Sequence, residues 1–235
     1  MEMARARAMA QAPRRRRAPD SVALALEVAA QAVAQSGHRA ADMASAFTSA
    51  HGDRTSTDSL CSTLVRTPTP VSPTKFLNSV HNAALGCWTQ ATGCLQASVA
   101  VSAFRRSFAA GLLEACVQCA AEERAVLLVA CDIEACGALA STIESRGLLG
   151  FARVLSPAQG ARSVAALAWS LVSGPAAPRR LHSAAAQALA GNAMADGLPL
   201  FKALALERQA AFRLPLSAML RLELRLHGHG GNLGR

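Results

Sequence analysis

The sequence contains no tyrosine, few aromatic residues of any kind and only two lysines. Aromatic residues make up 4% of the 235 residues, and the lysines are Lys75 and Lys202. The positive charge is therefore almost entirely arginine, a bias typical of GC-rich genomes. A formal net charge of +9 favours a nucleic-acid-binding protein. Without aromatics interleaved among the arginines to stack on bases, this alternative is disfavoured, and nucleic acid is not an expected partner.

Long apolar runs are also missing. No stretch of 18 or more uncharged apolar residues occurs, so no membrane-spanning helix is predicted. Six arginines lie within the first 17 residues, but the apolar stretch that follows is interrupted by Asp20 and Glu27. A secretory signal requires an uninterrupted apolar core, which is missing here. A transit peptide is rich in serine, whereas no serine precedes Ser21. We expect a disordered arginine-rich tail over residues 1–18 and a cytoplasmic protein.

Cysteine occurs an odd number of times and lacks the spacing of a metal site. The seven residues are Cys61, Cys87, Cys94, Cys116, Cys119, Cys131 and Cys136. An odd number scattered through apolar segments indicates reduced, buried thiols rather than a disulfide framework. Cys116 and Cys119 form a C-x-x-C pair, but zinc would need a second matched pair. We expect neither a metal nor another cofactor.

With 51% hydrophobic residues, the chain can build one sizeable domain, which we place at residues 19–226 with a flexible tail over 227–235. Hydrophobic periodicity predicts helices over 20–36, 55–65, 73–93, 104–121, 181–190 and 197–208. Strands are predicted over 44–50, 97–102, 125–131, 148–155, 164–172 and 220–226. The strands at 148–155 and 164–172 are expected to be neighbours joined by a turn. The pattern indicates an α/β fold with a mixed sheet and helices packed on it.

The strand over 97–102 runs directly into the helix over 104–121. The predicted apolar stripe of that helix is Phe104, Phe108, Leu112, Ala115 and Cys119. A sharp strand-to-helix elbow holds a side chain at a helix N-terminus, where the helix dipole lowers a thiol pKa or stabilises an oxyanion. The elbow is therefore the most informative place in the sequence.

Two segments carry a resemblance to a known family. One reads Val71-Ser72-Pro73-Thr74-Lys75-Phe76-Leu77-Asn78-Ser79-Val80-His81-Asn82-Ala83-Ala84-Leu85-Gly86, and the other runs from Ala97 to Ala115 and includes Phe108-Ala109-Ala110-Gly111-Leu112-Leu113-Glu114-Ala115. Both resemble the β-ketoacyl synthase-like N-terminal domain family, and in particular chain length factors found with aryl polyene biosynthesis. The similarity is strongest over 20–172. It implies the N-terminal half of a thiolase-like ketosynthase fold.

The resemblance implies that this elbow carries a nucleophilic cysteine in an active ketosynthase. Alignment of the following helix places Phe104 at that position and Ala103 before it. Neither these residues nor Ser102 and Arg105 provide a thiol, and a serine nucleophile would need an adjacent base. We therefore expect a degenerate elbow and no catalytic residue there.

The resemblance also implies two catalytic histidines from the C-terminal half of the fold, a half that we do not expect in this chain. His227 and His229 lie in a glycine-rich tail and are not expected to replace them. We interpret the chain as a chain-length-factor-like partner of a β-ketoacyl synthase, with an acyl carrier protein as a further partner. A stand-alone cysteine acyltransferase remains an alternative.

This interpretation assigns a candidate interface or tunnel. Its residues are Phe76, Asn78, His81, Asn82, Phe104 and Phe108. For His81 we expect mainly a buried hydrogen bond that ties its helix to a loop, since buried polar groups are usually paired. For Phe104 two roles are open: the first apolar residue of the helix stripe, or a side chain that shapes an acyl pocket.

Overall fold

The computed structural model describes residues 18–67, 71–141, 145–176 and 181–228. Its first sheet has four strands in the order β2 (Ser98–Val101), β1 (Ala44–Thr48), β3 (Val126–Asp132) and β4 (Leu149–Leu155). β1 pairs in parallel with β2 and with β3, whereas β4 pairs antiparallel with β3. The sheet is mixed, as predicted. Every residue of β1 and β3 is buried, as expected for strands covered on both faces.

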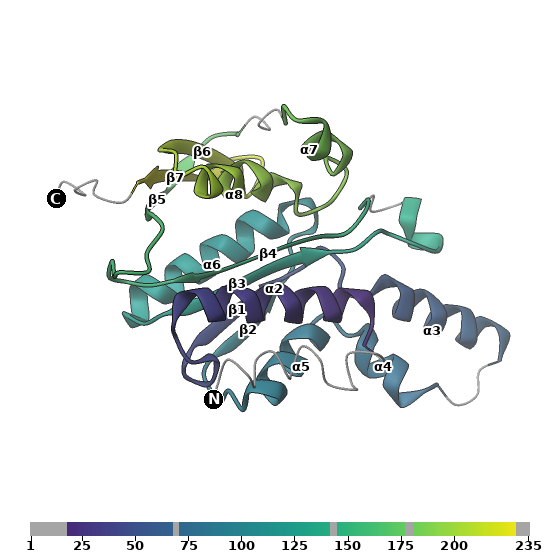
Figure 1. Ribbon diagram of the computed structural model, residues 1–235. Helices are drawn as coiled ribbons and strands as arrows, with labels where there is room; N and C mark the ends of the chain where they lie inside the picture. Colours follow the sequence, from purple (N-terminus) through teal and green to yellow (C-terminus); the bar gives the residue numbers. More distant parts are fainter. Residues whose placement is uncertain (1–17, 68–70, 142–144, 177–180, 229–235) are drawn as a thin grey trace.

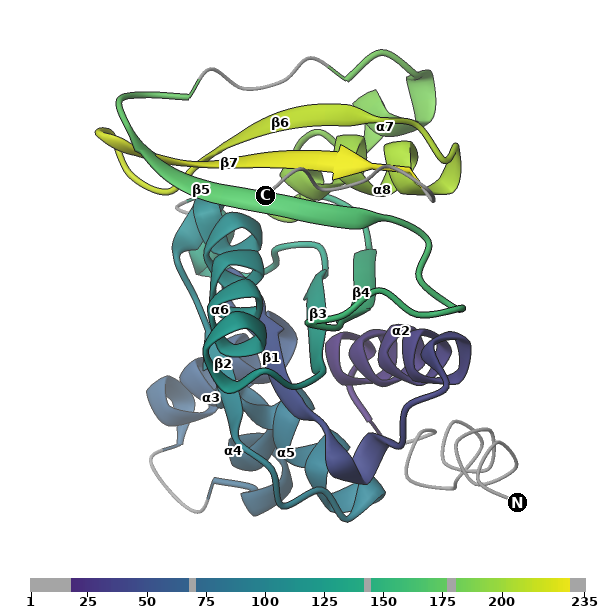
Figure 2. The ribbon, with the colours of Figure 1, turned by 90° about the vertical axis from the view of Figure 1, so that its left-hand side faces the viewer.

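Helices cover both faces of this sheet. α2 (Asp20–Ser36) and α5 (Ala83–Thr92) share a core with one face, and α6 (Ser107–Glu122) packs on the other. Figure 2 shows the sheet between α6 and α2. α2 ends at Gly37, whose φ of +78° is a left-handed conformation that glycine adopts without a Cβ clash.

A second sheet contains β5 (Ala166–Ser173), β7 (Leu220–His227) and β6 (Ala210–Pro215), all antiparallel. Its inner face shares one hydrophobic core with α6 and with α8 (Leu198–Ala205). Figure 1 shows this sheet as a layer above the first one. Phe108 lies in this core, with its ring centroid 6.0 Å from that of Phe151 and 6.3 Å from that of Phe201.

The remaining elements surround the first sheet. α3 (Arg54–Arg66) follows β1 and packs against α4 (Pro73–Ser79). α7 (Ala184–Ala188) precedes α8. Short 3-10 turns complete the described chain: η2 (Ala40–Asp42), η3 (Phe104–Arg106), η4 (Ala138–Ser141) and η5 (Ala195–Gly197). No described helix has both the length and the apolar character needed to cross a membrane.

Several predicted elements are corrected by the structure. The strands near 148–155 and 164–172 are not neighbours, because β4 pairs with β3 and β5 belongs to the second sheet. β6 was not predicted. The helix over 73–93 is two helices, α4 and α5, interrupted at Val80–Asn82.

Three predictions concern the helix stripe and the chain ends. Phe104 does not belong to the stripe of α6, because it lies in η3 and is 44% exposed. His227 is the last residue of β7 and not part of a flexible tail. Residues 1–17 and 229–235, including His229, lie outside the described chain, so the predicted tails stay predictions there.

Candidate functional site

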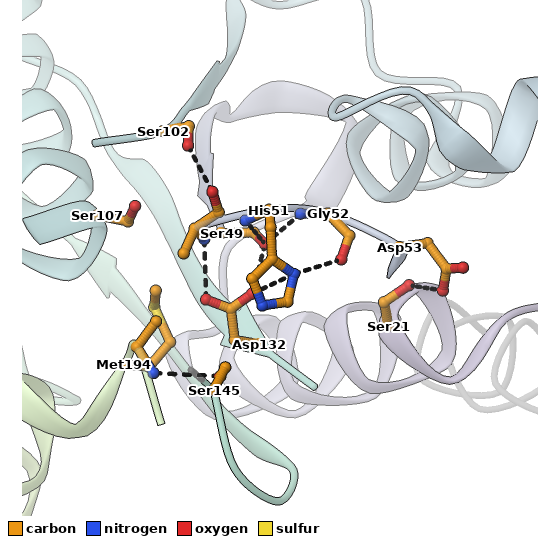
Figure 3. Close-up of polar contacts among 12 residues, drawn as sticks. Ser21, Ser49, His51, Gly52, Asp53, Ser102, Ser107, Asp132, Ser145 and Met194 are labelled. Atoms are coloured by element: carbon orange, nitrogen blue, oxygen red, sulfur yellow. Dashed lines mark hydrogen bonds and ion pairs between the residues drawn. The ribbon is translucent and has the colours of Figure 1, made fainter. Parts of the chain in front are cut away.

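The carboxyl ends of the three parallel strands meet at one edge of the first sheet. β1 is followed by Ser49 and His51, β2 by Ser102, and β3 ends at Asp132. Figure 3 shows Ser49 and Asp132 next to His51, and Ser102 bonded to the loop after β1. Polar groups after parallel strands form the usual site of open α/β sheets, so this edge is the candidate site.

The predicted elbow is present between β2 and α6. Ser107 is fully buried at the start of α6, and its hydroxyl accepts a hydrogen bond from the Ala103 amide at 2.9 Å and donates one to the Phe104 carbonyl at 2.7 Å. The Ser102 hydroxyl donates to the Ala50 carbonyl at 2.9 Å, which ties the elbow to the loop after β1. Ser102 is thus engaged in a structural contact and has no adjacent base in the described structure.

Phe104 occupies the elbow in an unfavourable backbone conformation. Its φ of +56° is a left-handed value that a bulky side chain rarely adopts. Such outliers cost about 1–3 kcal/mol and persist where the surrounding structure imposes them. The Phe104 side chain is 44% exposed, so the elbow presents an apolar ring to the outside.

Asp132 organises the loop after β1. Its carboxylate accepts hydrogen bonds from the Ser49 hydroxyl at 2.7 Å and from the Ala50 amide at 2.8 Å. The Nδ1 atom of His51 lies 3.6 Å from a carboxylate oxygen of Asp132 and 3.3 Å from the Gly52 carbonyl oxygen. Because both neighbours of Nδ1 are acceptors, this nitrogen carries the proton, and Nε2 is left as the free ring nitrogen.

Burial shifts both ionisable groups toward their neutral forms. It lowers the pKa of His51, an effect that the Asp132 charge opposes and the Arg54 charge reinforces. Burial also raises the pKa of Asp132, while His51 and the hydrogen bonds from Ala50 and Ser49 act in the opposite direction. Burial thus opposes charge on both groups, whereas their mutual attraction and the hydrogen bonds to Asp132 favour it.

The residues predicted for an interface or tunnel are dispersed. Phe76 on α4 is 57% exposed and Asn82 is exposed, whereas Asn78 is half-buried. His81 makes the predicted hydrogen bond, from Nε2 to the Ser49 carbonyl at 2.9 Å, and thereby ties the break between α4 and α5 to the site loop. Phe108 is fully buried in the core and does not lie on the surface of this chain.

α3 and α4 enclose an apolar groove of about 540 Å³. Its lining residues are Thr57, Leu60, Cys61, Leu64, Val71, Pro73, Phe76 and Ser79, none of them charged. Exposed apolar side chains continue from the groove onto the neighbouring surface, at Val65 (85% exposed) and Leu77 (64%). Contiguous apolar surface of this kind marks interaction sites on soluble proteins.

Comparison with known proteins assigns the fold. The model of the beta-ketoacyl synthase N-terminal domain family matches residues 2–217. The chain belongs to this family. In the solved complex of the ketosynthase ApeO with its chain length factor ApeC from Xenorhabdus doucetiae, one chain is similar, with 23% identity and a TM-score of 0.67. The match covers 90% of this chain and 79% of that one. No curated protein matches.

As a member of the beta-ketoacyl synthase N-terminal domain family, the chain retains an elbow between β2 and α6. The segment from Ala97 to Ala115, which includes this elbow, contains no cysteine. Among the described residues, no group of three or more His, Cys, Asp and Glu residues is arranged to hold a metal ion.

Sequence reasoning missed the polar residues of the loop after β1 and their partner on β3. None of His51, Asp132 and Arg54 was among the predicted site residues. A signal was available, because Asp132 follows directly on the continuous apolar run from Ala125 to Cys131. A carboxylate at the end of a buried strand indicates a site at the sheet edge.

Proposed function

We propose that this family member is a non-catalytic, chain-length-factor-like partner of a β-ketoacyl synthase in polyene or fatty-acid-type biosynthesis. In this proposal it completes a shared acyl tunnel and limits the length of the acyl chain. It acts in the cytoplasm, and the growing chain is carried by an acyl carrier protein. The observation that carries the proposal is Phe104, an exposed aromatic side chain on a retained nucleophile elbow.

The described chemistry of the elbow supports a non-catalytic role. Phenylalanine cannot form a thioester, and the nearest hydroxyls, those of Ser102 and Ser107, are held by backbone carbonyls. Two thiols of the core are also poor nucleophiles, because burial raises the pKa of Cys116 and of Cys131 to about 12. A condensation reaction at this elbow would therefore depend on a nucleophile from a partner.

The surface beside the elbow supports a partner. β2 is an edge strand of the first sheet, and its outer edge is unpaired in the described chain. Unpaired edges are templates for pairing with another chain. Phe104 lies three residues after Val101, the last residue of β2, and Phe76 and Leu77 on α4 are further exposed apolar side chains. An apolar surface beside an open strand edge suits a stable interface with another subunit.

The similar structure supports the same assignment. It contains a ketosynthase and a chain length factor, and the two coverage fractions indicate that the matched chain is only slightly longer than this one. We assign to this chain the role of the chain length factor, because its elbow lacks the nucleophile that a ketosynthase requires.

The length of the product tests the proposal. We expect a reconstituted system of the partner ketosynthase, acyl carrier protein and this chain to make longer acyl chains with Phe104→Ala and shorter ones with Phe104→Trp. Mass spectrometry of the carrier-bound products measures the distribution. Met219→Ala is the matched control, since Met219 is exposed and lies on the second sheet side. An identical product distribution for all four proteins would contradict a role of Phe104 in the tunnel.

A further inference from the structure

Arg54 is a buried charge without a partner. It is the first residue of α3 and only 4% exposed. Its Nη1 atom is buried and makes no hydrogen bond, and no ion pair of Arg54 occurs in the described part of the chain. A buried guanidinium is costly unless an acceptor compensates it, so the position calls for an anion.

The carboxylates of this region are already engaged. Asp53 caps α3 and accepts hydrogen bonds from the Ser56 amide and from the Ser21 hydroxyl, both at 2.6 Å. Asp132 is held by Ser49 and Ala50, as described above. Asp58, one turn further along α3, points its carboxylate toward Gly137. None of the three forms an ion pair with Arg54, so its guanidinium has no carboxylate partner among them.

A second unpartnered group lies beside Arg54. The His51 side chain is only 4% exposed, and its Nε2 atom is buried without a hydrogen-bond partner. The two residues are electrostatically close, because the charge of Arg54 lowers the pKa of His51. Two buried polar atoms without partners, on residues three apart in one loop, indicate a shared missing ligand.

The helix adds a third contribution. α3 has 13 residues, and its N-terminus carries the positive end of the helix dipole and backbone amides without intrahelical acceptors. The Asp53 carboxylate already caps this end through the Ser56 amide, so what the helix adds around Arg54 is the positive field of its dipole. Thr55, the next residue of α3, is exposed, and its hydroxyl lies 3.6 Å from the Cys136 sulfur.

We propose that Arg54 and His51, at the start of α3, bind one compact oxyanion, a carboxylate or a phosphoryl group. The guanidinium binds the oxyanion directly, in the geometry that arginine offers to both groups. His51 takes up a proton from solvent and donates Nε2–H to the ligand, while Nδ1–H remains directed at the Gly52 carbonyl, next to Asp132. Occupancy orders the loop after β1 and so connects ligand binding to the elbow through the Ser102–Ala50 hydrogen bond.

Titration of the intact protein with inorganic phosphate and with acetate, at constant ionic strength set with chloride, tests this site. NMR of ¹⁵N-labelled histidine follows His51, assigned from its absence in His51→Gln. We expect saturable shifts of the His51 resonances and an upward shift of its pKa with one of the two probes. Response to phosphate alone assigns a phosphoryl group, and response to acetate alone assigns a carboxylate.

Two variants separate the site from general charge effects. Arg54→Gln should weaken binding at least 10-fold, whereas Arg105→Gln, which removes an exposed arginine, should leave it unchanged. Absence of a saturable response in the unmodified protein, or equal binding by Arg54→Gln, would overturn the proposal. Because the assay needs no ketosynthase, its failure would leave the proposed partnership untouched.

Discussion

The backbone of Phe104 can be tested independently of any partner. A backbone φ of +56° is unfavourable for any residue with a Cβ atom, so only glycine adopts it without a loss of folding free energy. We expect Phe104→Gly to be more stable than Phe104→Ala by about 1 kcal/mol. Urea denaturation of the two variants measures the difference.

The control uses the same pair of substitutions at an ordinary helical position. Val117 lies on α6 and is 42% exposed, and there glycine should be less stable than alanine by about 1 kcal/mol. If alanine were also the more stable residue at position 104, the elbow would not be held in a left-handed conformation.

The pH dependence of stability reports on His51. Its pKa is lowered from 6.5, so below pH 6.5 the unfolded chain binds the proton more readily than the folded one, and the free energy of unfolding falls with acidification. The raised pKa of Asp132 acts in the opposite sense, since its contribution is lost as pH rises above 3.8. Arg54 and His81 are the other charged or titratable groups that act on His51, and both lower its pKa.

We expect His51→Gln to lose the decline of stability that sets in below pH 6.5. Chemical denaturation at a series of pH values measures it. His38→Gln serves as the control, because His38 is exposed and its side chain makes no contact in the site. A decline that persists unchanged in His51→Gln would show that another group causes it.

At the scale of elements, local sequence patterns predicted helix and strand boundaries correctly where tertiary packing favours the same boundaries. α2 spans Asp20–Ser36, the range that the hydrophobic periodicity predicted. The break between α4 and α5 was not predictable, because Val80 to Asn82 carry no strong helix breaker. It is fixed by the long-range hydrogen bond from His81 to Ser49. β6 showed an alternation of buried Phe212 and Leu214 with exposed Arg213 that could have been recognised.

The open edge of β2 gives a prediction about assembly. The carbonyls of Ala97 and Val101 accept hydrogen bonds from β1, so the backbone groups of Ala100, which alternate with them, face outward. Ala100→Pro removes an outward amide while the pairing with β1 is kept. We expect this variant to fold, and we expect its affinity for the ketosynthase to be at least 10-fold lower. Ala100→Gly, which keeps the amide, should bind normally.

Isothermal titration calorimetry with the purified ketosynthase compares these two variants. Circular dichroism establishes that both are folded. Equal affinity of Ala100→Pro and the unmodified chain would exclude β2 as the pairing edge.

At the scale of the whole molecule, the arrangement of the two sheets could not be derived from the sequence. The connection between β4 and β5 contains Pro157 and Gly160 and reads as a hairpin turn, yet it crosses from one sheet to the other. The elbow was predicted from sequence because its elements are adjacent in the chain. The His51–Asp132 pair joins residues 81 positions apart, and only the parallel pairing of β1 with β3 brings them together.

Co-expression of this chain with the ketosynthase encoded nearest to its gene tests the central claim most directly. After affinity purification, native mass spectrometry gives the composition of the complex, and condensation activity is measured with each chain alone and with both. We predict a stoichiometric complex that is active only when both chains are present and that depends on a cysteine of the ketosynthase. A monomer or homodimer that does not bind the ketosynthase would contradict the account.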